Sequence, residues 1–261
     1  MSADDPLAAF RLDDRLIVVT GASQGIGRHL AEGFARAGAA VVLASRRADR
    51  LDEVAASIAA HGGRADVVPT DVSRLDDVAR LADAVRDLAQ HDGRYLVLVN
   101  NAGLGFTKPA LEVDEADWAR VFEAQVKGTF FCSQRIGALM LGRGYGKIVN
   151  MSSTWAVRSE PGKSVYCAAK AAISQLTAAL STEWAPRGVR VNALAPATTM
   201  TDAGRGRMEA DPARAALLKS RIRLGRFAEP SDLLGAAVFL AGAASDFVTG
   251  QTLFVDGGFT S

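Results

Sequence analysis

Short runs of consecutive apolar residues occur at intervals along the whole chain. The runs are rich in Val, Ile and Leu and lack alternating polar positions, which is typical of parallel strands buried on both faces of a sheet. We therefore expect strands at residues 16–20, 40–45, 65–69, 96–100, 147–151, 190–194 and 252–255.

The stretches between these runs carry apolar residues at helical spacing. We expect helices at residues 26–37, 50–61, 75–89, 115–141, 165–185 and 231–241. Alternating strands and helices with short links indicate βαβ units. The pattern predicts an α/β fold, a doubly wound parallel sheet of about seven strands with helices on both faces. We expect one domain over 1–261, with an irregular, polar substrate lid at about 196–226.

Composition narrows the classes of partner. The 261 residues include 30 basic and 29 acidic side chains, and a formal net charge of +1 favours neither nucleic acid nor a membrane surface. The two cysteines and three histidines show no metal-ligand spacing, so we expect no metal and reduced thiols. The acidic N-terminus has no apolar run and the chain has no long apolar segment, which predicts a cytoplasmic protein without signal peptide or transmembrane helix.

A glycine-rich turn follows the first predicted strand and opens the first helix. Its glycines are spaced G-x-x-x-G-x-G, where one permits the tight turn, one lets the backbone approach a pyrophosphate and one allows close helix packing. The helix N-terminus would offer free N–H groups to the anion. An ordinary loop is the alternative. The turn predicts dinucleotide contacts from Gly21, Ser23, Gln24, Gly25, Ile26 and Gly27.

The end of the second predicted strand bears on cofactor preference. An NAD site usually presents an acidic residue here to the ribose 2′-hydroxyl, whereas this chain has Ser45, Arg46 and Arg47. A guanidinium binds a 2′-phosphate well. We therefore favour NADP(H) over NAD(H), and the alternative is that both arginines are merely solvated.

Several further motifs occur in a fixed order, and together they resemble the short-chain dehydrogenase/reductase family over about residues 10–261. The resemblance implies a Rossmann-type fold, with closer similarity to 3-oxoacyl-carrier-protein reductase-like and gluconate 5-dehydrogenase-like members. The motifs are Thr20–Gly27, Asp71-Val72, Asn100-Asn101-Ala102-Gly103, Ser153, Tyr166-x-x-x-Lys170, Asn192 to Pro196, Gly250-Gln251 and Val255-Asp256-Gly257-Gly258.

The resemblance implies that Tyr166 is the catalytic acid/base, assisted by Ser153 and Lys170. Tyr166 and Lys170 are four residues apart and share a helix face, so we expect the ammonium to lower the pKa of the phenol. Ser153 would stabilise charge at the reacting oxygen. Ser152 is the other candidate, although the thirteen-residue spacing to Tyr166 favours Ser153.

The resemblance also implies cofactor contacts beyond the glycine turn. Asp71 would contact the adenine, although a capping role for its carboxylate is an equal alternative. Asn100 would additionally tie strands together, and Lys170 would bind the ribose. These contacts are Asp71, Val72, Asn100, Ala102, Gly103, Tyr166, Lys170, Pro196, Thr199 and Thr201.

Two positions depart from the family pattern. Gln125 is the fourth catalytic residue that the resemblance implies. It stands where the family has an asparagine that helps to hold a water beside the catalytic lysine, and its added methylene leaves the geometry of the proton relay undecided. Ala197 replaces the glycine that usually follows Pro196, which stiffens this turn.

We expect reversible hydride transfer between a nicotinamide and a secondary alcohol or ketone, with a small-molecule substrate. The alternative is a catalytically silent NADP(H)-binding regulatory protein on the same fold. The family resemblance implies a homotetramer formed through the helix of Tyr166 and the helix near Phe130. An anionic substrate or an ordinary mixed, solvated surface would each account for four basic residues, Arg158, Lys163, Arg205 and Arg207.

Overall fold

Seven parallel strands form one sheet in the computed structural model, which describes residues 7–261 apart from the side chain of Asp92. The strand order is β3-β2-β1-β4-β5-β6-β7, which confirms the predicted doubly wound, Rossmann-type architecture. The strands are β1 (Arg15–Thr20), β2 (Ala40–Ser45), β3 (Arg64–Pro69), β4 (Tyr95–Asn100), β5 (Gly146–Met151), β6 (Val189–Pro196) and β7 (Thr252–Val255).

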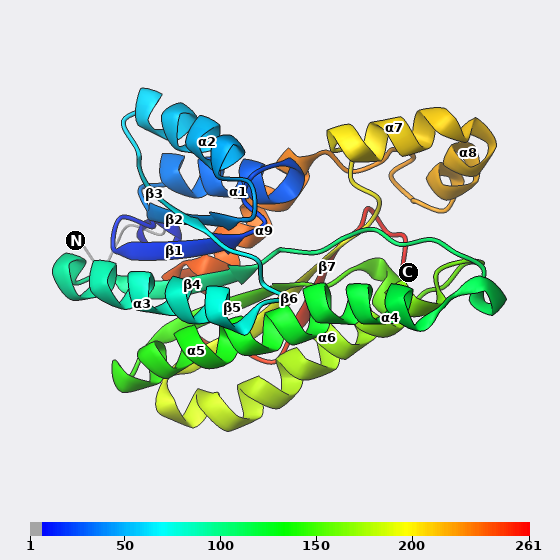
Figure 1. Cartoon of the computed structure of the whole chain (residues 1–261). Coiled ribbons are helices and arrows are strands. Elements are labelled where there is room, and N and C mark those ends of the chain that lie inside the picture. The colour runs from blue at the N-terminus through cyan, green and yellow to red at the C-terminus, as the bar shows by residue number, and fades with distance from the viewer. Residues whose placement is uncertain (1–6) are drawn as a thin grey trace.

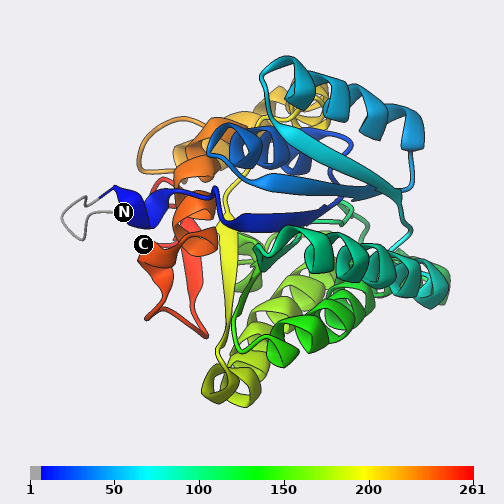
Figure 2. The ribbon, with the colours of Figure 1, turned by 90° about the vertical axis from the view of Figure 1, so that its left-hand side faces the viewer.

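Helices cover both faces of the sheet (Figure 2). Alternate residues of β1 point to opposite faces, so Ile17 and Val19 join one buried cluster while Leu16 and Val18 join the other. The first cluster is closed by α1 (Gly25–Arg36), α2 (Ala48–Ala60) and α9 (Pro230–Ala241). The second is closed by α3 (Leu75–Asp92), α5 (Gly128–Gly142) and α6 (Ser164–Trp184).

The chain changes winding direction between β1 and β4, which are neighbours in the sheet although two strands separate them in sequence. Loops that leave the carboxyl ends of such strands diverge to opposite faces, and ligands bind in the crevice between them. The fold therefore places the glycine-rich turn after β1 opposite the Asn101-Ala102-Gly103 segment after β4.

The helix expected over 115–141 is interrupted. It consists of α4 (Glu115–Phe122), a π-helical segment (Glu123–Lys127) and α5. Within the π segment the side chain of Gln125 is buried and donates to the carbonyl of Leu104. The apolar pattern predicted one continuous helix and did not reveal this π-helical segment.

The stretch expected to be irregular, 196–226, contains two short helices, α7 (Asp202–Ala210) and α8 (Pro212–Ser220). In Figure 1 they stand apart from the sheet, at the end of the molecule where the carboxyl ends of the strands lie. Thr201 and Asp211 cap their N-termini by accepting from the amides of Gly204 and Arg214. Both helices therefore begin at a capping side chain. Together their sequences contain glycines and charged residues and show no apolar residues at helical spacing, so the pattern did not predict them.

Composition led to expectations about the thiols, membrane-spanning helices and metal sites. Cys132 and Cys167 are free thiols. Across residues 7–261, no helix combines the length and apolar character needed to cross a bilayer. The same residues bring no three His, Cys, Asp or Glu side chains into a metal-binding group. Residues 1–6, which form part of the N-terminus discussed above, lie outside the described residues.

Candidate active site

A cavity of about 1280 Å³ lies at the carboxyl ends of the strands, between the sheet and α7–α8. Every residue predicted to act in catalysis or to contact the cofactor lines it, except Asn100. These lining residues are Gly21, Ser23, Gln24, Gly25, Ile26, Gly27, Ser45, Arg46, Arg47, Asp71, Val72, Ala102, Gly103, Gln125, Ser153, Tyr166, Lys170, Pro196, Thr199 and Thr201.

The turn after β1 has the geometry that a pyrophosphate requires. Gly21 has a φ of +67°, which L side chains rarely adopt. A Cβ on Gly27 would lie 2.3 Å from the Gly21 carbonyl oxygen, so only glycine lets α1 start this close to the turn. No side chain caps the N-terminus of α1, which leaves its amides available to an anion.

Asn100 is the one predicted contact that the structure does not place in the cavity. Its amide nitrogen donates to Asn150 Oδ1 and Ser133 Oγ, each at 2.9 Å, so it ties β4 to β5 and α5. The neighbouring residue, Asn101, lines the cavity and donates to the carbonyl oxygen of Thr20 at 2.9 Å. β4 ends at Asn100, so of the two asparagines only Asn101 faces the turn after β1.

Ser45, Arg46 and Arg47 line the end of the cavity beyond β2. Arg47 donates from Nη2 to Gln24 Oε1 at 2.5 Å, which links it to the glycine-rich turn.

Asp71 also lines the cavity, and its Oδ1 accepts from the amide and the hydroxyl of Ser73 at 3.0 and 2.7 Å. The Asp71 carboxylate thus holds a local turn and borders the cavity at once.

Three of the four predicted catalytic side chains, those of Ser153, Tyr166 and Lys170, come from the end of β5 and from α6. Tyr166 and Lys170 lie one turn apart on α6, and Ser153 directly follows β5. Ser153 Oγ accepts from the amide of Trp155 at 3.2 Å and lies close enough to the Tyr166 phenol to lower its pKa through hydrogen bonding. Ser152, by contrast, shares a hydrogen bond with Ser174 Oγ at 2.7 Å and donates to the Lys170 carbonyl at 3.2 Å, so it anchors α6 to β5.

Burial sets the ionisation of this group. It raises the pKa of Tyr166 to about 12, against a lowering effect of the Ser153 hydrogen bond and of the Arg207 charge. Burial also lowers the pKa of Lys170 to about 7. Lys170 Nζ lies 5.7 Å from the centre of the Tyr166 ring. The pKa of the phenol is therefore raised, because the effect of burial exceeds the lowering effects that act on Tyr166.

Comparison with known proteins agrees with this arrangement. The family model described as enoyl-(acyl carrier protein) reductase matches residues 21–260. The chain is 40% identical to gluconate 5-dehydrogenase of Gluconobacter oxydans, covering 96% of each chain. It is also 40% identical to the L-tagatose-forming galactitol 2-dehydrogenase of Cereibacter sphaeroides, covering 98% of this chain and 99% of that one.

A solved structure shows the same likeness. Gluconate 5-dehydrogenase of Burkholderia cenocepacia, in complex with NADP and tartrate, is 37% identical, with a TM-score of 0.91 over 97% of this chain and 98% of that chain. The chain belongs to the short-chain dehydrogenases/reductases. It is therefore an oxidoreductase, as the order of its motifs implies.

In this short-chain dehydrogenase/reductase, Gln125 keeps a position beside the site. It is fully buried, and its Nε2 donates to the Leu104 carbonyl at 2.9 Å. Its Oε1 has no hydrogen-bond partner within residues 7–261. The added methylene thus directs the amide nitrogen to the loop after β4 and leaves one buried acceptor free.

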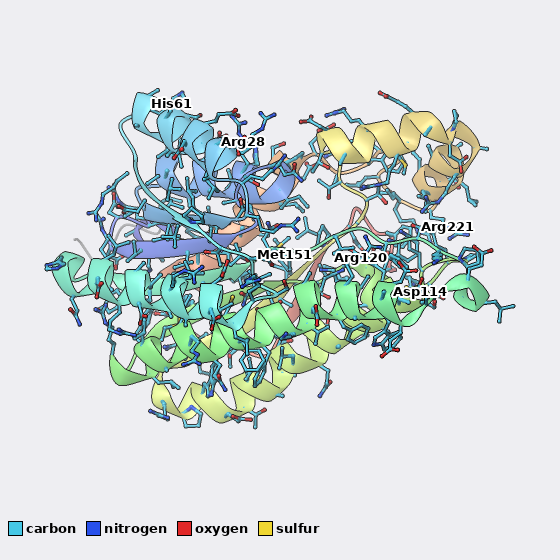
Figure 3. The ribbon with its side chains drawn as sticks, viewed as in Figure 1. Arg28, His61, Asp114, Arg120, Met151 and Arg221 are labelled. Carbon is cyan, nitrogen blue, oxygen red and sulfur yellow. The ribbon has the colours of Figure 1, made fainter. Side chains whose placement is uncertain are left out.

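The far end of the cavity combines apolar and basic side chains. Trp155, Met208 and Leu218 form a buried cluster that includes part of Tyr166. Arg120 on α4 and Met151 at the end of β5, both labelled in Figure 3, belong to the same lining. Three further basic residues, Lys163, Arg207 and Arg214, complete this end.

Proposed function

We propose that this enzyme interconverts a secondary alcohol and its ketone in a small polyhydroxylated substrate, with NADP(H) as the preferred cofactor. One observation carries the proposal. The side chains of Tyr166 and Ser153 line a single cavity that continues to the glycine-rich turn. Relatives named for a sugar acid and for a polyol support this substrate class.

The residues of the chain supply binding and proton transfer, while a bound nicotinamide would supply the carbon that exchanges hydride. The cradle of Gly21 and Gly27 and the uncapped N-terminus of α1 would hold the pyrophosphate. In alcohol oxidation Tyr166 accepts the hydroxyl proton and Ser153 hydrogen-bonds the same oxygen. Lys170 sits below the phenol ring and would bind the ribose, and Gln125 positions the loop after β4.

The preference for NADP(H) rests on the end of β2. Ser45 is followed by two exposed arginines that line the cavity, and none of these three positions carries a carboxylate that would repel a phosphate. Pro196, Thr199 and Thr201 line the cavity after β6, where the nicotinamide end would lie.

Three further features belong to this proposal. Residues 196–226, with α7 and α8, would act as the lid of a single domain. A homotetramer is supported by an apolar groove of about 650 Å³, which would bring the α5–α6 faces of two copies together. The groove is lined by Ala119, Phe122, Glu123, Val126, Lys127, Phe130, Phe131, Ala172 and Leu176.

The location of the protein is part of the same proposal. Free thiols at both cysteines support a cytoplasmic location.

The test is a panel of polyols, sugar acids and simple secondary alcohols, each offered with NADP⁺ and with NAD⁺. We expect absorbance of the reduced nicotinamide to appear with at least one polyhydroxylated substrate, and faster with NADP⁺. Binding of NADPH without turnover of any substrate would favour the silent regulatory protein instead.

A further inference from the structure

The structure separates the four basic residues that the sequence offered as anion contacts. Arg205 pairs with Glu229 at 2.7 Å, and Arg158 donates to the carbonyl of Thr260. Neither lines the cavity. Lys163 and Arg207 do line it, beside Tyr166. Only these two of the four face the place where a substrate would react.

Arg207 reaches across the mouth of the cavity from α7 to the loop after β4. Its Nη1 lies 3.7 Å from the position that a Cβ on Gly105 would occupy, so the guanidinium lies against this loop. Within residues 7–261, Arg207 has neither an ion pair nor a side-chain hydrogen bond. A planar guanidinium without a partner matches the two oxygens of a carboxylate.

Lys163 provides a second positive charge on the same side of the phenol. Its ammonium donates to the Phe106 carbonyl at 3.0 Å and to Thr107 Oγ1 at 2.5 Å, and it lies 5.4 Å from the centre of the Tyr166 ring. These two bonds leave one of its three N–H donors. Burial, followed by the charge of Arg214, lowers the pKa of Lys163, as two cations sharing one site should.

The nearby carboxylates form no ion pair with these two cations, although the charge of Glu160 acts to raise the pKa of Lys163. Glu160 is taken by Arg214 of α8, with which it forms an ion pair. Asp117 pairs with Lys108 at 2.5 Å and with Arg120 at 3.2 Å. The acidic residues of the lining, Asp71 and Glu123, form no ion pair with Lys163 or Arg207. The region beside Tyr166 therefore has a surplus of positive charge.

We infer that Arg207, with Lys163, binds the anionic end of the substrate, so that this enzyme prefers hydroxy acids to neutral polyols. The inference rests on the proposed function and narrows its substrate class. A carboxylate held between the two cations would lie beside the phenol, which would place a hydroxyl a few carbons along the chain at Tyr166. A neutral polyol offers no charge to this pair.

The test uses acid and polyol pairs with the same carbon skeleton, namely gluconate with glucitol, galactonate with galactitol and threonate with threitol. We expect kcat/KM of the wild type to favour the acid of the preferred pair about tenfold or more, as a charge-assisted contact allows. Arg207→Met should abolish most of that preference, about tenfold, through KM, and Arg207→Lys should restore part of it. Arg205→Met, in the same helix but paired outside the cavity, is the matched control and should keep it.

The ratio of kcat/KM for the acid to kcat/KM for the polyol of a pair separates binding from chemistry. Any effect of Arg207 on the Tyr166 phenol lowers kcat/KM for both substrates alike and leaves the ratio unchanged. Equal loss for acid and polyol in Arg207→Met, or a wild type that prefers polyols, would overturn the inference and leave the proposed function standing. If neither class is oxidised, the proposed function fails. Calorimetric titration of gluconate then decides the inference, which requires binding to the wild type with NADPH and weaker binding to Arg207→Met.

Discussion

The ammonium of Lys170 donates to the carbonyl oxygen of Met151, 2.8 Å away, at the last residue of β5. This bond fixes the lysine beneath the Tyr166 ring and ties α6 to the strand that carries Ser153. The side chain is 6% exposed, so the bond holds a charge in a place that disfavours it.

Lys170 should give the protein a pH-dependent stability. Burial lowers its pKa from 10.5 to about 7. Between these values the unfolded chain binds a proton that the folded protein lacks, so the free energy of unfolding rises with pH, by at most about 1.4 kcal/mol per pH unit. Below pH 7 the Lys170 contribution is constant and unfavourable.

Denaturant unfolding of the cofactor-free protein between pH 7 and 10 checks this expectation. Lys170→Met should lose the rise, whereas Lys219→Met, which removes an exposed lysine of α8, should keep it. The same slope in the wild type and Lys170→Met would contradict the assigned burial penalty.

The strands were predicted to within two residues, because strands buried on both faces need continuous apolar runs. The π segment and the lid helices were missed. The lid helices begin with side-chain to backbone hydrogen bonds made by Thr201 and Asp211. Local bonds of this kind leave no apolar period in the sequence.

The candidate site likewise contains features that the sequence predicted and features that it did not. Motif order placed Tyr166, Lys170 and Ser153, but only coordinates could assign Asn101 rather than Asn100 to the cavity. The raised pKa of Tyr166 could not be predicted, because burial is a property of the packed structure. Likewise, the sequence could not tell the partnered Arg205 from the unpartnered Arg207.

Ser153 should control the pH dependence of alcohol oxidation. Oxidation needs the deprotonated phenol, so the rate rises with pH up to the pKa of Tyr166. The Ser153 hydrogen bond lowers that pKa. Ser153→Ala should therefore move the alkaline limb of kcat/KM to higher pH and lower kcat about 100- to 1000-fold.

Ser152→Ala is the contrast, because the Ser152 hydroxyl bonds Ser174 and the Lys170 carbonyl instead of Tyr166. It should reduce stability and leave the alkaline limb in place. A limb that shifts equally in both variants would argue against a specific role for Ser153.

Arg46 should decide the choice of cofactor. The side chain is exposed at the end of the cavity beyond β2, where a 2′-phosphate would lie. Arg46→Ala should weaken NADPH binding about 10- to 100-fold and leave NADH binding within about twofold. Arg50→Ala, which removes an exposed arginine paired with Glu53 outside the cavity, should change neither. Fluorescence titration with each cofactor measures both affinities, and equal losses for NADPH and NADH in Arg46→Ala would remove the 2′-phosphate assignment.

The central claim is that the phenol oxygen of Tyr166 carries the proton of the reaction. The most direct measurement is turnover of the best substrate by Tyr166→Phe, which removes that oxygen and keeps the ring, alongside titration of the same variant with NADPH. We predict that kcat falls at least about 1000-fold while NADPH still binds with nearly the affinity of the wild type. Turnover within tenfold of the wild type would contradict the account.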